Sequence, residues 1–324
     1  MKRTDLGRLA FIAAALFILG AALARRGRSA PGPVKIAYLP IYSDLPLFVA
    51  QERGFFAARG VKVELVRFAA SADMATALLE GAADAGASVA YSVVLAKESR
   101  DPGRLKIFMA DSETRKGYLT SLVVRGGSPI KTVAGLKGKT LASFPGPTAV
   151  TFCKLVLAKH GLDPDKDVRL VELELGSHLQ ALESGRVDAL FTYEPVGTQA
   201  VLEKGAVKLL PAAVETDVLD PWQAGVWVVS DRFLSSRPAD AARVIAALSD
   251  AVDFARAQPK EAKEALGAYT HISAAVARAT PDIPVTRLGE MDLAALQKQT
   301  DILFEKGVVS KRLRADSLLL KTPR

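Results

Sequence analysis

Apolar and charged residues alternate in several short segments of the chain, and stretches with helical spacing separate these segments. Residues 34–39 (VKIAYL) and 61–66 (VKVELV) predict two strands with a helix between them. A second predicted helix, 71–79, is followed by a short third strand at 84–89. This order of strand, helix, strand, helix, strand is typical of βαβ units and predicts parallel sheets.

The same order recurs about a hundred residues further along the chain. The second copy consists of predicted strands and helices at 139–143, 148–159, 168–173, 179–182 and 188–191. Three pairs of identical residues are offset by 104 positions: Lys35 and Lys139, Gly81 and Gly185, Asp84 and Asp188. Because internal repeats reflect architecture, the sequence predicts two similar lobes.

Two apolar strands connect the copies, 119–124 leading forward and 225–230 leading back. We therefore expect lobe 1 to contain residues 34–120, lobe 2 to contain 121–224, and the remaining residues to return to lobe 1. The C-terminal part has helical spacing and should pack on lobe 1. The predicted fold is α/β, with a βαβ-based sheet flanked by helices in each lobe and a ligand cleft between the lobes.

The N-terminal residues 9–24 form an uncharged, mostly apolar run of sixteen residues with basic residues on both sides. This pattern predicts an export signal that is cut after Ala24. An uncleaved membrane anchor remains the alternative, because basic residues directly after the cut disfavour export and the run is only slightly shorter than the ~20 residues that span a bilayer. The run has no cysteine at its end, which excludes lipid attachment of the bacterial lipoprotein kind.

Composition and charge exclude several classes of protein and of binding partner. The 324 residues are 49% hydrophobic and 24% charged, which excludes a disordered chain and a polytopic membrane protein. The net charge is +8, but residues 1–30 hold six basic residues and one acidic residue, which leaves +3 for the rest. We therefore expect no nucleic-acid partner. One cysteine, Cys153, and three histidines leave no disulfide framework and little material for a metal site, so no cofactor is expected.

Ligands of parallel sheets bind beyond the carboxyl ends of the strands. This rule selects five loops: 39–44, 69–73, 87–92, 143–148 and 192–195. If the lobes face each other, these loops meet in one cleft, which is a common position for a small-molecule site.

The loops carry three kinds of candidate ligand-binding residue. Hydroxyl groups near helix N-termini could hold an oxyanion, although Ser71 and Thr148 could instead cap their own helices. Carboxylates repel an anion but accept hydrogen bonds from an amine or aminopyrimidine, and aromatic rings either stack on a flat ligand or pack in the core. Together with Thr120 near the hinge, the candidates are Tyr42, Asp44, Ser71, Asp73, Ser88, Tyr91, Thr120, Phe144, Thr148, Tyr193, Glu194 and Trp222.

Catalytic motifs are weak in this chain. Cys153 lies on a predicted helix and is expected in the core. His178 lies at a helix start without a neighbouring base or nucleophile, so we expect it at the surface, and His160 next to Gly161 fits a helix C-terminus. No Walker loop, paired metal-binding histidines or nucleophile elbow is present, so no catalytic residue is predicted.

Several short motifs are distributed over about residues 34–310. They are PLFVA at 46–50, ERGFF at 52–56, GVKV at 60–63, ALLEG at 77–81 with Asp84, VAGLKGK at 133–139, GRVDA at 185–189 and YEP at 193–195. Together they resemble the motifs of nitrate, sulfonate and taurine binding proteins of ABC transporters, a superfamily that includes NMT1/THI5-like binders of thiamine pyrimidine precursors. The resemblance implies a type II periplasmic binding protein, a monomer whose lobes close on a small ligand and are then recognised by a permease with its ATPase.

The chain departs from the pattern of this superfamily in two places. The loop 143–148 reads SFPGPT, whereas the sulfonate branch often has a loop rich in glycine, serine and threonine, so a sulfonate ligand is less favoured. The cysteine cluster of the pyrimidine-synthesising enzymes is absent. Glu194 resembles an acid that pyrimidine binders use towards an exocyclic amine, which favours a heteroaromatic or amine-bearing ligand.

The leading hypothesis is an exported solute-binding protein that closes around a hinge near 120–124 and 225–229 and delivers its ligand to a membrane permease. The ligand would be a small nitrogen- or sulfur-containing metabolite, of the nitrate, sulfonate and taurine type or of the pyrimidine type. Two alternatives remain open: a pyrimidine-synthase-like enzyme, and a sensor tethered to the membrane through residues 9–24.

Overall fold

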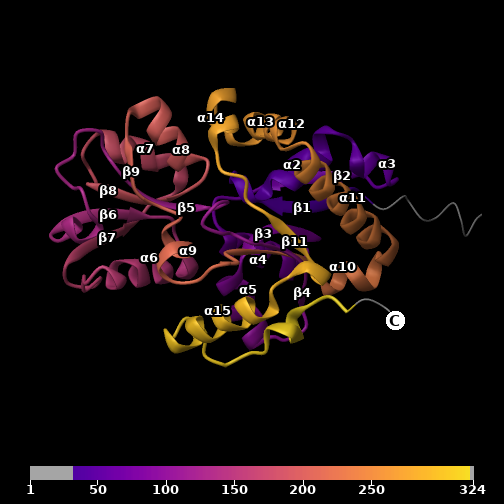
Figure 1. The fold of residues 1–324 in the computed structure, drawn as a ribbon. Coiled ribbons are helices and arrows are strands. Elements are labelled where there is room, and N and C mark those ends of the chain that lie inside the picture. Colours follow the sequence, from indigo (N-terminus) through magenta and orange to yellow (C-terminus); the bar gives the residue numbers. More distant parts are fainter. Residues whose placement is uncertain (1–31, 322–324) are drawn as a thin grey trace, which may run out of the picture. The chain divides into compact units, whose positions relative to one another are not determined.

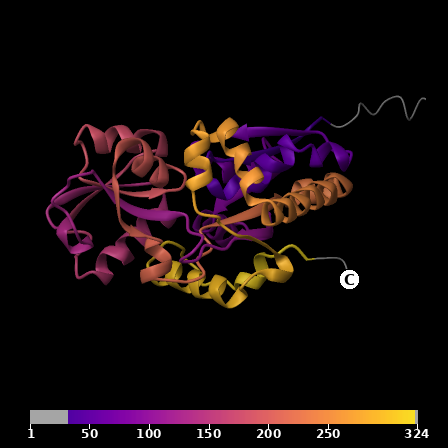
Figure 2. The ribbon, with the colours of Figure 1, turned by 45° about the horizontal axis from the view of Figure 1, so that its top comes forward.

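The computed structural model describes residues 32–321, and Val34–Arg324 form one compact unit. This unit contains two sheets, each covered by helices (Figure 1). We call the six-stranded sheet with its helices lobe 1 and the five-stranded sheet with its helices lobe 2; Figure 2 shows the two beside each other. The predicted export segment at 9–24 lies outside the described residues.

The strands of the two sheets follow the predicted hydrophobic segments. The sheet of lobe 1 has the order β11-β4-β10-β3-β1-β2, and that of lobe 2 has the order β7-β6-β8-β5-β9. In chain order the strands are β1 Val34–Tyr38, β2 Val63–Arg67, β3 Ala85–Ala90, β4 Leu105–Asp111, β5 Thr120–Val124, β6 Lys139–Ser143, β7 Val168–Glu172, β8 Ala189–Tyr193, β9 Val207–Pro211, β10 Gly225–Ser230 and β11 Val285–Arg287. The segments 119–124 and 225–230 were both predicted as strands, and both are confirmed.

Helices connect the strands and cover the sheets. In lobe 1 they are α2 Leu45–Glu52, α3 Phe55–Ala58, α4 Ser71–Glu80, α5 Tyr91–Arg100, α10 Asp231–Ser236, α11 Pro238–Ala257, α12 Pro259–Ala262, α13 Leu266–Thr270, α14 Ala274–Ala279 and α15 Leu293–Glu305. In lobe 2 they are α6 Pro147–Lys159, α7 Leu175–Glu183, α8 Val196–Lys204 and α9 Ala213–Asp217. Short 3-10 turns are Tyr42–Asp44, Val133–Leu136, Lys263–Ala265, Leu288–Glu290 and Ala315–Leu318. No helix among residues 32–321 is long and apolar enough to cross a membrane.

The predicted repeat is visible in the backbone. Gly81 and Gly185 both end a helix in the left-handed region, with φ of 78° and 76°, which glycine adopts without strain. Asp84 accepts a hydrogen bond from the backbone N–H of Lys35 at 2.9 Å, and Asp188 accepts the corresponding bond from Thr140 at 2.9 Å. In the structure Lys35 therefore corresponds to Thr140, with an offset of 105, whereas Gly81 and Gly185, and Asp84 and Asp188, keep the offset of 104.

The expectation of parallel sheets is wrong for part of each lobe. The first three strands of each copy pair in parallel, but β10 is antiparallel to β3 and β5 is antiparallel to β8. The physical reason is the exchange of strands: each crossing strand enters its sheet from the other lobe and so runs in the opposite direction. Strands β4 and β9, which the pattern did not reveal, complete the two sheets next to the crossing strands.

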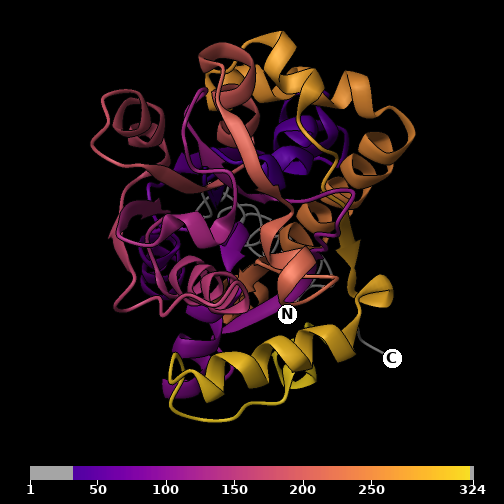
Figure 3. The same ribbon diagram turned by 60° about the vertical axis from the view of Figure 1, so that its left-hand side comes forward.

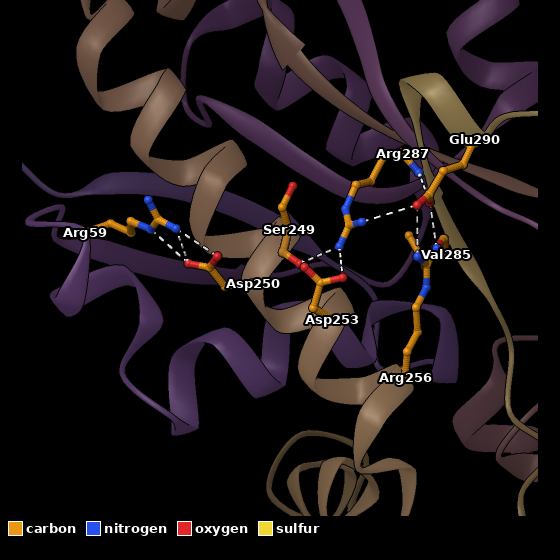
Figure 4. Close-up of polar contacts among 8 residues, drawn as sticks. All are labelled: Arg59, Ser249, Asp250, Asp253, Arg256, Val285, Arg287 and Glu290. Atoms are coloured by element: carbon orange, nitrogen blue, oxygen red, sulfur yellow. Dashed lines mark hydrogen bonds and ion pairs between the residues drawn. The ribbon is translucent and has the colours of Figure 1, made fainter.

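The C-terminal helices pack on lobe 1, and α11 to α14 lie on the opposite side of this lobe from α15 (Figure 3). Charged side chains hold α11 in place (Figure 4). Arg59 after α3 makes two hydrogen bonds of 2.8 Å to Asp250, and Arg256 donates to Glu290 at 2.7 Å and to the Val285 carbonyl at 2.7 Å. Because these groups are partly exposed, they orient the helix more than they stabilise it.

Candidate functional site

A cavity of about 170 Å³ lies between the two lobes. Its walls come from the ends of strands and from the first turns of helices α4 and α6. They also come from the two segments in which the chain passes from one lobe to the other, 112–119 and 218–225, which we call the crossing segments. The lining residues are Leu39, Ile41, Ala70, Ser71, Ala72, Ser88, Ala90, Val93, Leu119, Phe144, Pro145, Gly146, Pro147, Thr148, Ala149, Tyr193, Ala224 and Gly225. None of these residues carries a charged side chain, and most are apolar.

Each of the five loops selected from the sequence contributes to this cavity. The ranges 39–44, 69–73 and 87–92 supply lining residues from lobe 1, and 143–148 and 192–195 supply them from lobe 2. Five of the twelve candidate ligand-binding residues line it: Ser71, Ser88, Phe144, Thr148 and Tyr193. The structure thus brings the loops together as expected for carboxyl ends of strands that face each other.

The hydroxyl groups of the cavity bond to other elements and do not cap their own helices. Ser71 Oγ accepts a hydrogen bond from the backbone N–H of Ala90 at 3.1 Å. The hydroxyls of Thr148 on α6 and Ser92 on α5 are 2.5 Å apart, which joins lobe 2 to lobe 1 at a buried position. These bonds fix the cavity walls relative to each other.

The loop after β6 forms the lobe 2 wall of the cavity. Gly146 has φ of 108°, which favours glycine, and its N–H donates to the carboxylate of Glu172 at 2.8 Å. Pro147 then starts α6 at a position where a missing N–H leaves no bond unmade. The rings of Phe144 and Tyr193 lie next to each other with centroids 5.1 Å apart. This wall is therefore rigid and mainly apolar.

Glu194 is not exposed to the cavity. Its carboxylate is fully buried and binds Lys208 Nζ at 2.6 Å and the backbone N–H of Thr198 at 2.9 Å. Lys208 lies on β9, a strand that the sequence pattern did not reveal. The carboxylate is thus already occupied by an ammonium group of the chain itself.

The other six candidates also lie outside the cavity lining. Tyr42 donates to Asp282 at 3.0 Å and lines a separate pocket of about 210 Å³ on lobe 1. Tyr91 and Trp222 are buried in the core, the first bonded to Thr300 at 2.7 Å. The remaining three are Asp44, which accepts from the Leu39 N–H, Asp73, which is exposed on α4, and Thr120, which is buried at the start of β5.

The two crossing segments pair with each other behind the cavity. The backbones of Glu113 and Trp222 exchange two hydrogen bonds, of 2.8 and 2.9 Å. Glu113 also accepts from the N–H of Ala224 at 3.3 Å, and Ala224 lines the cavity. Because burial opposes ionisation, the pKa of Glu113 lies well above its ordinary value. A further carboxyl group, that of Glu215 on α9, is buried nearby, and its pKa is raised to about 8 by burial.

Cys153, His160 and His178 contact other parts of the protein and do not line the cavity. Cys153 is buried in α6, as predicted, and burial raises the pKa of its thiol. His160 caps the end of the same helix and contacts Asp217 at 2.8 Å. The expectation of a surface position for His178 is wrong: its ring is fully buried between the Thr192 hydroxyl and the Leu173 carbonyl, at 2.9 Å from each, and burial lowers its pKa to about 4.

Sequence reasoning missed the cavity residues that belong to neither repeat. Leu119, Ala224 and Gly225 lie where the chain crosses between the lobes, and Val93 lies in the first turn of α5. A glycine directly before an apolar crossing strand was a usable signal for Gly225. Within residues 32–321, no group of three or more His, Cys, Asp or Glu side chains is placed to hold a metal ion.

Two α/β lobes joined by crossing strands, with a cavity between them, define the fold of a periplasmic binding protein. The structure matches the alkanesulfonate-binding protein SsuA from Xanthomonas axonopodis pv. citri bound to MOPS with a TM-score of 0.75 at 22% identity, over 91% of this chain and 100% of that chain. It also matches the desulfurization enzyme DSZB with a TM-score of 0.65 at 19% identity, over 88% of this chain and 96% of that chain. At these identities both similarities concern the fold alone. The two matched proteins are a binding protein and an enzyme, so this fold occurs with both kinds of function.

Residues 43–262 match the family described as NMT1/THI5 like, and the chain belongs to this family. It is 25% identical to a putative aliphatic sulfonates-binding protein of Bacillus subtilis over 278 residues, 83% of this chain and 80% of that protein. It is 26% identical to the bicarbonate-binding protein CmpA of Synechococcus sp. over 204 residues, 52% of this chain. The chain matches only 44% of the length of that CmpA protein. Both relatives are named as binding proteins.

Proposed function

We propose that this chain is an exported, periplasmic solute-binding protein that captures a small uncharged ligand, largely apolar and heteroaromatic, between its lobes and delivers it to an ABC permease. The observation that carries this proposal is the cavity between the lobes, whose lining contains no charged side chain. The family and the named relatives support the binding role.

The size of the cavity suits one small aromatic ring system of one or two fused rings. An apolar cavity of about 150 Å³ in another protein binds benzene, and the cavity here measures about 170 Å³. Phe144 and Tyr193 supply aromatic surface, while Ser71, Ser88 and Thr148 supply hydroxyl groups. Few polar groups in an apolar enclosure are typical of a site that orients a small organic molecule.

An anion such as a sulfonate, nitrate or bicarbonate fits this cavity less well. The N-termini of α4 and α6 would each favour a negative charge by about 0.3–1 kcal/mol. Removing an ion from water costs several kcal/mol when no counter-charge is present. Two helix ends therefore do not offset the desolvation of an anion, and we infer that the ligand is uncharged.

Thermal unfolding with added ligands tests the proposal. A ligand that binds only the folded protein raises the melting temperature with its concentration. We expect 4-amino-2-methylpyrimidine, benzimidazole or indole to stabilise the protein, and taurine, methanesulfonate, nitrate and bicarbonate to have no effect at the same concentrations. Stabilisation by the anions alone would refute the proposed ligand class. A loss of ligand uptake by intact cells that lack this protein would support delivery to a permease.

The tethered sensor and the enzyme differ from this proposal in measurable ways. N-terminal sequencing of the exported protein separates a cleaved signal, which gives a start at Arg25, from a retained anchor. An enzyme would need a nucleophile or base at the ligand, and among the described residues neither Cys153 nor His178 lines the cavity. Conversion of a bound ligand by the purified protein, followed by mass spectrometry, would favour the enzyme.

A further inference from the structure

The buried residue Asp111 fixes the direction in which the hydroxyl of Ser88, a cavity-lining residue, donates its hydrogen bond. Ser88 lines the cavity, and its hydroxyl donates to Asp111 Oδ2 at 2.5 Å. Trp227 Nε1 donates to the other carboxylate oxygen, Oδ1, at 3.1 Å. Asp111 is fully buried at the end of β4 and does not line the cavity. In the ionised carboxylate, each oxygen therefore accepts a hydrogen bond from one of these donors. Burial raises the pKa of Asp111 to about 7, so the group is mostly ionised at pH 8.

The backbone around this pair is built for close approach. Ser88 has φ of 39°, a conformation that costs about 1–2 kcal/mol for a residue with a side chain. Gly225 lies opposite, and a Cβ atom there would be 2.2 Å from Ser88 Oγ and 2.4 Å from Asp111 Oδ2. Only glycine leaves room for the hydrogen bond at this position. The pair is therefore held by three separate elements, β3, β4 and β10.

The bond to Asp111 determines what Ser88 can offer a ligand. A serine hydroxyl has one proton and two acceptor lone pairs. Because the proton of Ser88 is directed at Asp111, its oxygen can only accept a hydrogen bond from the cavity side. Ser71 differs, because its oxygen accepts from the Ala90 N–H and its own proton remains free to be donated.

We propose that Asp111 is a positioning residue that makes Ser88 a hydrogen-bond acceptor, so that the site selects uncharged ligands that carry an N–H or O–H donor. This inference rests on the proposed function. The walls of the cavity are mostly apolar, so a ligand donor that misses Ser88 loses its bond to water with little replacement. Conversely, a ligand that presents only an acceptor to Ser88 places it against a lone pair of the serine oxygen, so no hydrogen bond forms.

Indole and benzofuran provide a matched pair of probes, because they share one shape and differ in an N–H donor against an oxygen acceptor. At pH 8 we expect wild type to bind indole about tenfold more tightly than benzofuran in titration calorimetry, as one hydrogen bond in a buried site would give.

Asp111→Asn should abolish or reverse this preference. Trp227 Nε1 is only a donor, so the amide oxygen must face it and the amide nitrogen must face Ser88. That nitrogen donates to Ser88 and frees the serine proton for the ligand. Glu98→Gln is the matched control: Glu98 is a buried carboxylate in the same lobe that also accepts two hydrogen bonds, from the N–H groups of Gly103 and Leu105, and it does not line the cavity. This control should keep the preference for indole.

The outcomes separate this inference from the proposed function. Equal binding of the two probes by wild type, or an unchanged preference in Asp111→Asn, overturns the role of Asp111 and leaves an uncharged ligand in place. Absence of binding by both probes overturns the inference together with the proposed ligand class. If near-UV circular dichroism shows that Asp111→Asn does not fold, Ser88→Gly decides, because glycine fits the positive φ and should lose the preference for indole while still binding both probes.

Discussion

Glu215 offers a direct test of how tightly α9 is packed against the rest of the protein. It lies on α9, where the chain leaves lobe 2, and it is 1% exposed. The backbone of Leu119 and the Thr120 hydroxyl lie near its carboxyl group and offset only part of the effect of burial. Burial disfavours the charged form and raises the pKa of Glu215 from 4.5 to about 8. We therefore expect Glu215 to hold its proton at neutral pH and to make the stability of the protein depend on pH.

The sign and the size of this dependence follow from proton linkage. Between pH 4.5 and 8 the folded protein holds the Glu215 proton while the unfolded chain has released it. The free energy of unfolding then falls by about 1.4 kcal/mol for each pH unit, or about 5 kcal/mol in total. Below pH 4.5 the group is protonated in both states and has no effect, and above pH 8 the loss is complete. A total stability of about 5–15 kcal/mol makes such a loss easy to measure.

Glu215→Gln removes the titration without changing the shape of the side chain. In urea unfolding at pH 5, 6, 7 and 8, we expect the variant and wild type to be similar at pH 5 and the variant to be several kcal/mol more stable at pH 8. Glu80→Gln, on an exposed position of α4, is the control and should follow wild type at every pH. If the free energy of unfolding of Glu215→Gln changes with pH in parallel to that of wild type, Glu215 ionises normally in the folded protein, which would contradict its burial on α9.

Three further changes test other contacts. Lys208→Met leaves the buried carboxylate of Glu194 without its counter-ion, which should cost about 3–5 kcal/mol in urea unfolding, and adding Glu194→Gln should recover part of the loss. Gly225→Ala places a Cβ 2.2 Å from the nearest side-chain oxygen, so we expect about 1–3 kcal/mol of destabilisation and a loss of ligand-induced thermal shift; unchanged binding would contradict this. Thr148→Val removes the hydrogen bond to Ser92 between the lobes, worth about 1 kcal/mol, and should increase the radius of gyration of the ligand-free protein in solution scattering, whereas Lys154→Met on the exposed side of the same helix should not.

The location of the site could be predicted from the sequence because it depends on local features. Each strand ends in a loop of small or turn-forming residues, and parallel strands place these loops at one edge of a sheet. Ser88 and Phe144 were found in this way, one from each copy of the repeat. Both line the cavity. This prediction depended only on the alternation of strands and helices. Hydrophobic periodicity, which reveals that alternation, is the most reliable signal in a single sequence.

The direction of each side chain could not be predicted in the same way. Glu194 sits in a loop before a proline, which reads as an exposed acid, yet β9 brings Lys208 against it and removes it from the cavity. A short, mostly apolar stretch at 207–211 (VKLLP) was the only sign of that strand. The surface position predicted for His178 is wrong for a similar reason, because Thr192, one of its two hydrogen-bond partners, is brought to it by β8.

The burial of Asp111 and Glu113 could not be predicted for a further reason. Asp111 and Glu113 follow an apolar segment and look like the polar end of a strand that meets solvent. They are buried because a second crossing segment, more than a hundred residues later, pairs with the first at Trp222. A pairing between two such distant segments has no local signal, so the residues that control the cavity from behind are found only in the folded chain.

The repeat explains why the scaffold and the ligand chemistry differ in how far the sequence predicts them. The two copies share the elements that build a lobe, down to the aspartates that bind the first strand in each, Asp84 and Asp188. They do not share the groups that line the cavity. Lobe 1 supplies hydroxyl groups such as that of Ser88, whereas lobe 2 supplies mainly rings and prolines such as Phe144 and Pro147. We therefore expect lobe 1 to orient the ligand through hydrogen bonds and lobe 2 to cover it with apolar surface. The site lies where the two copies stop resembling each other.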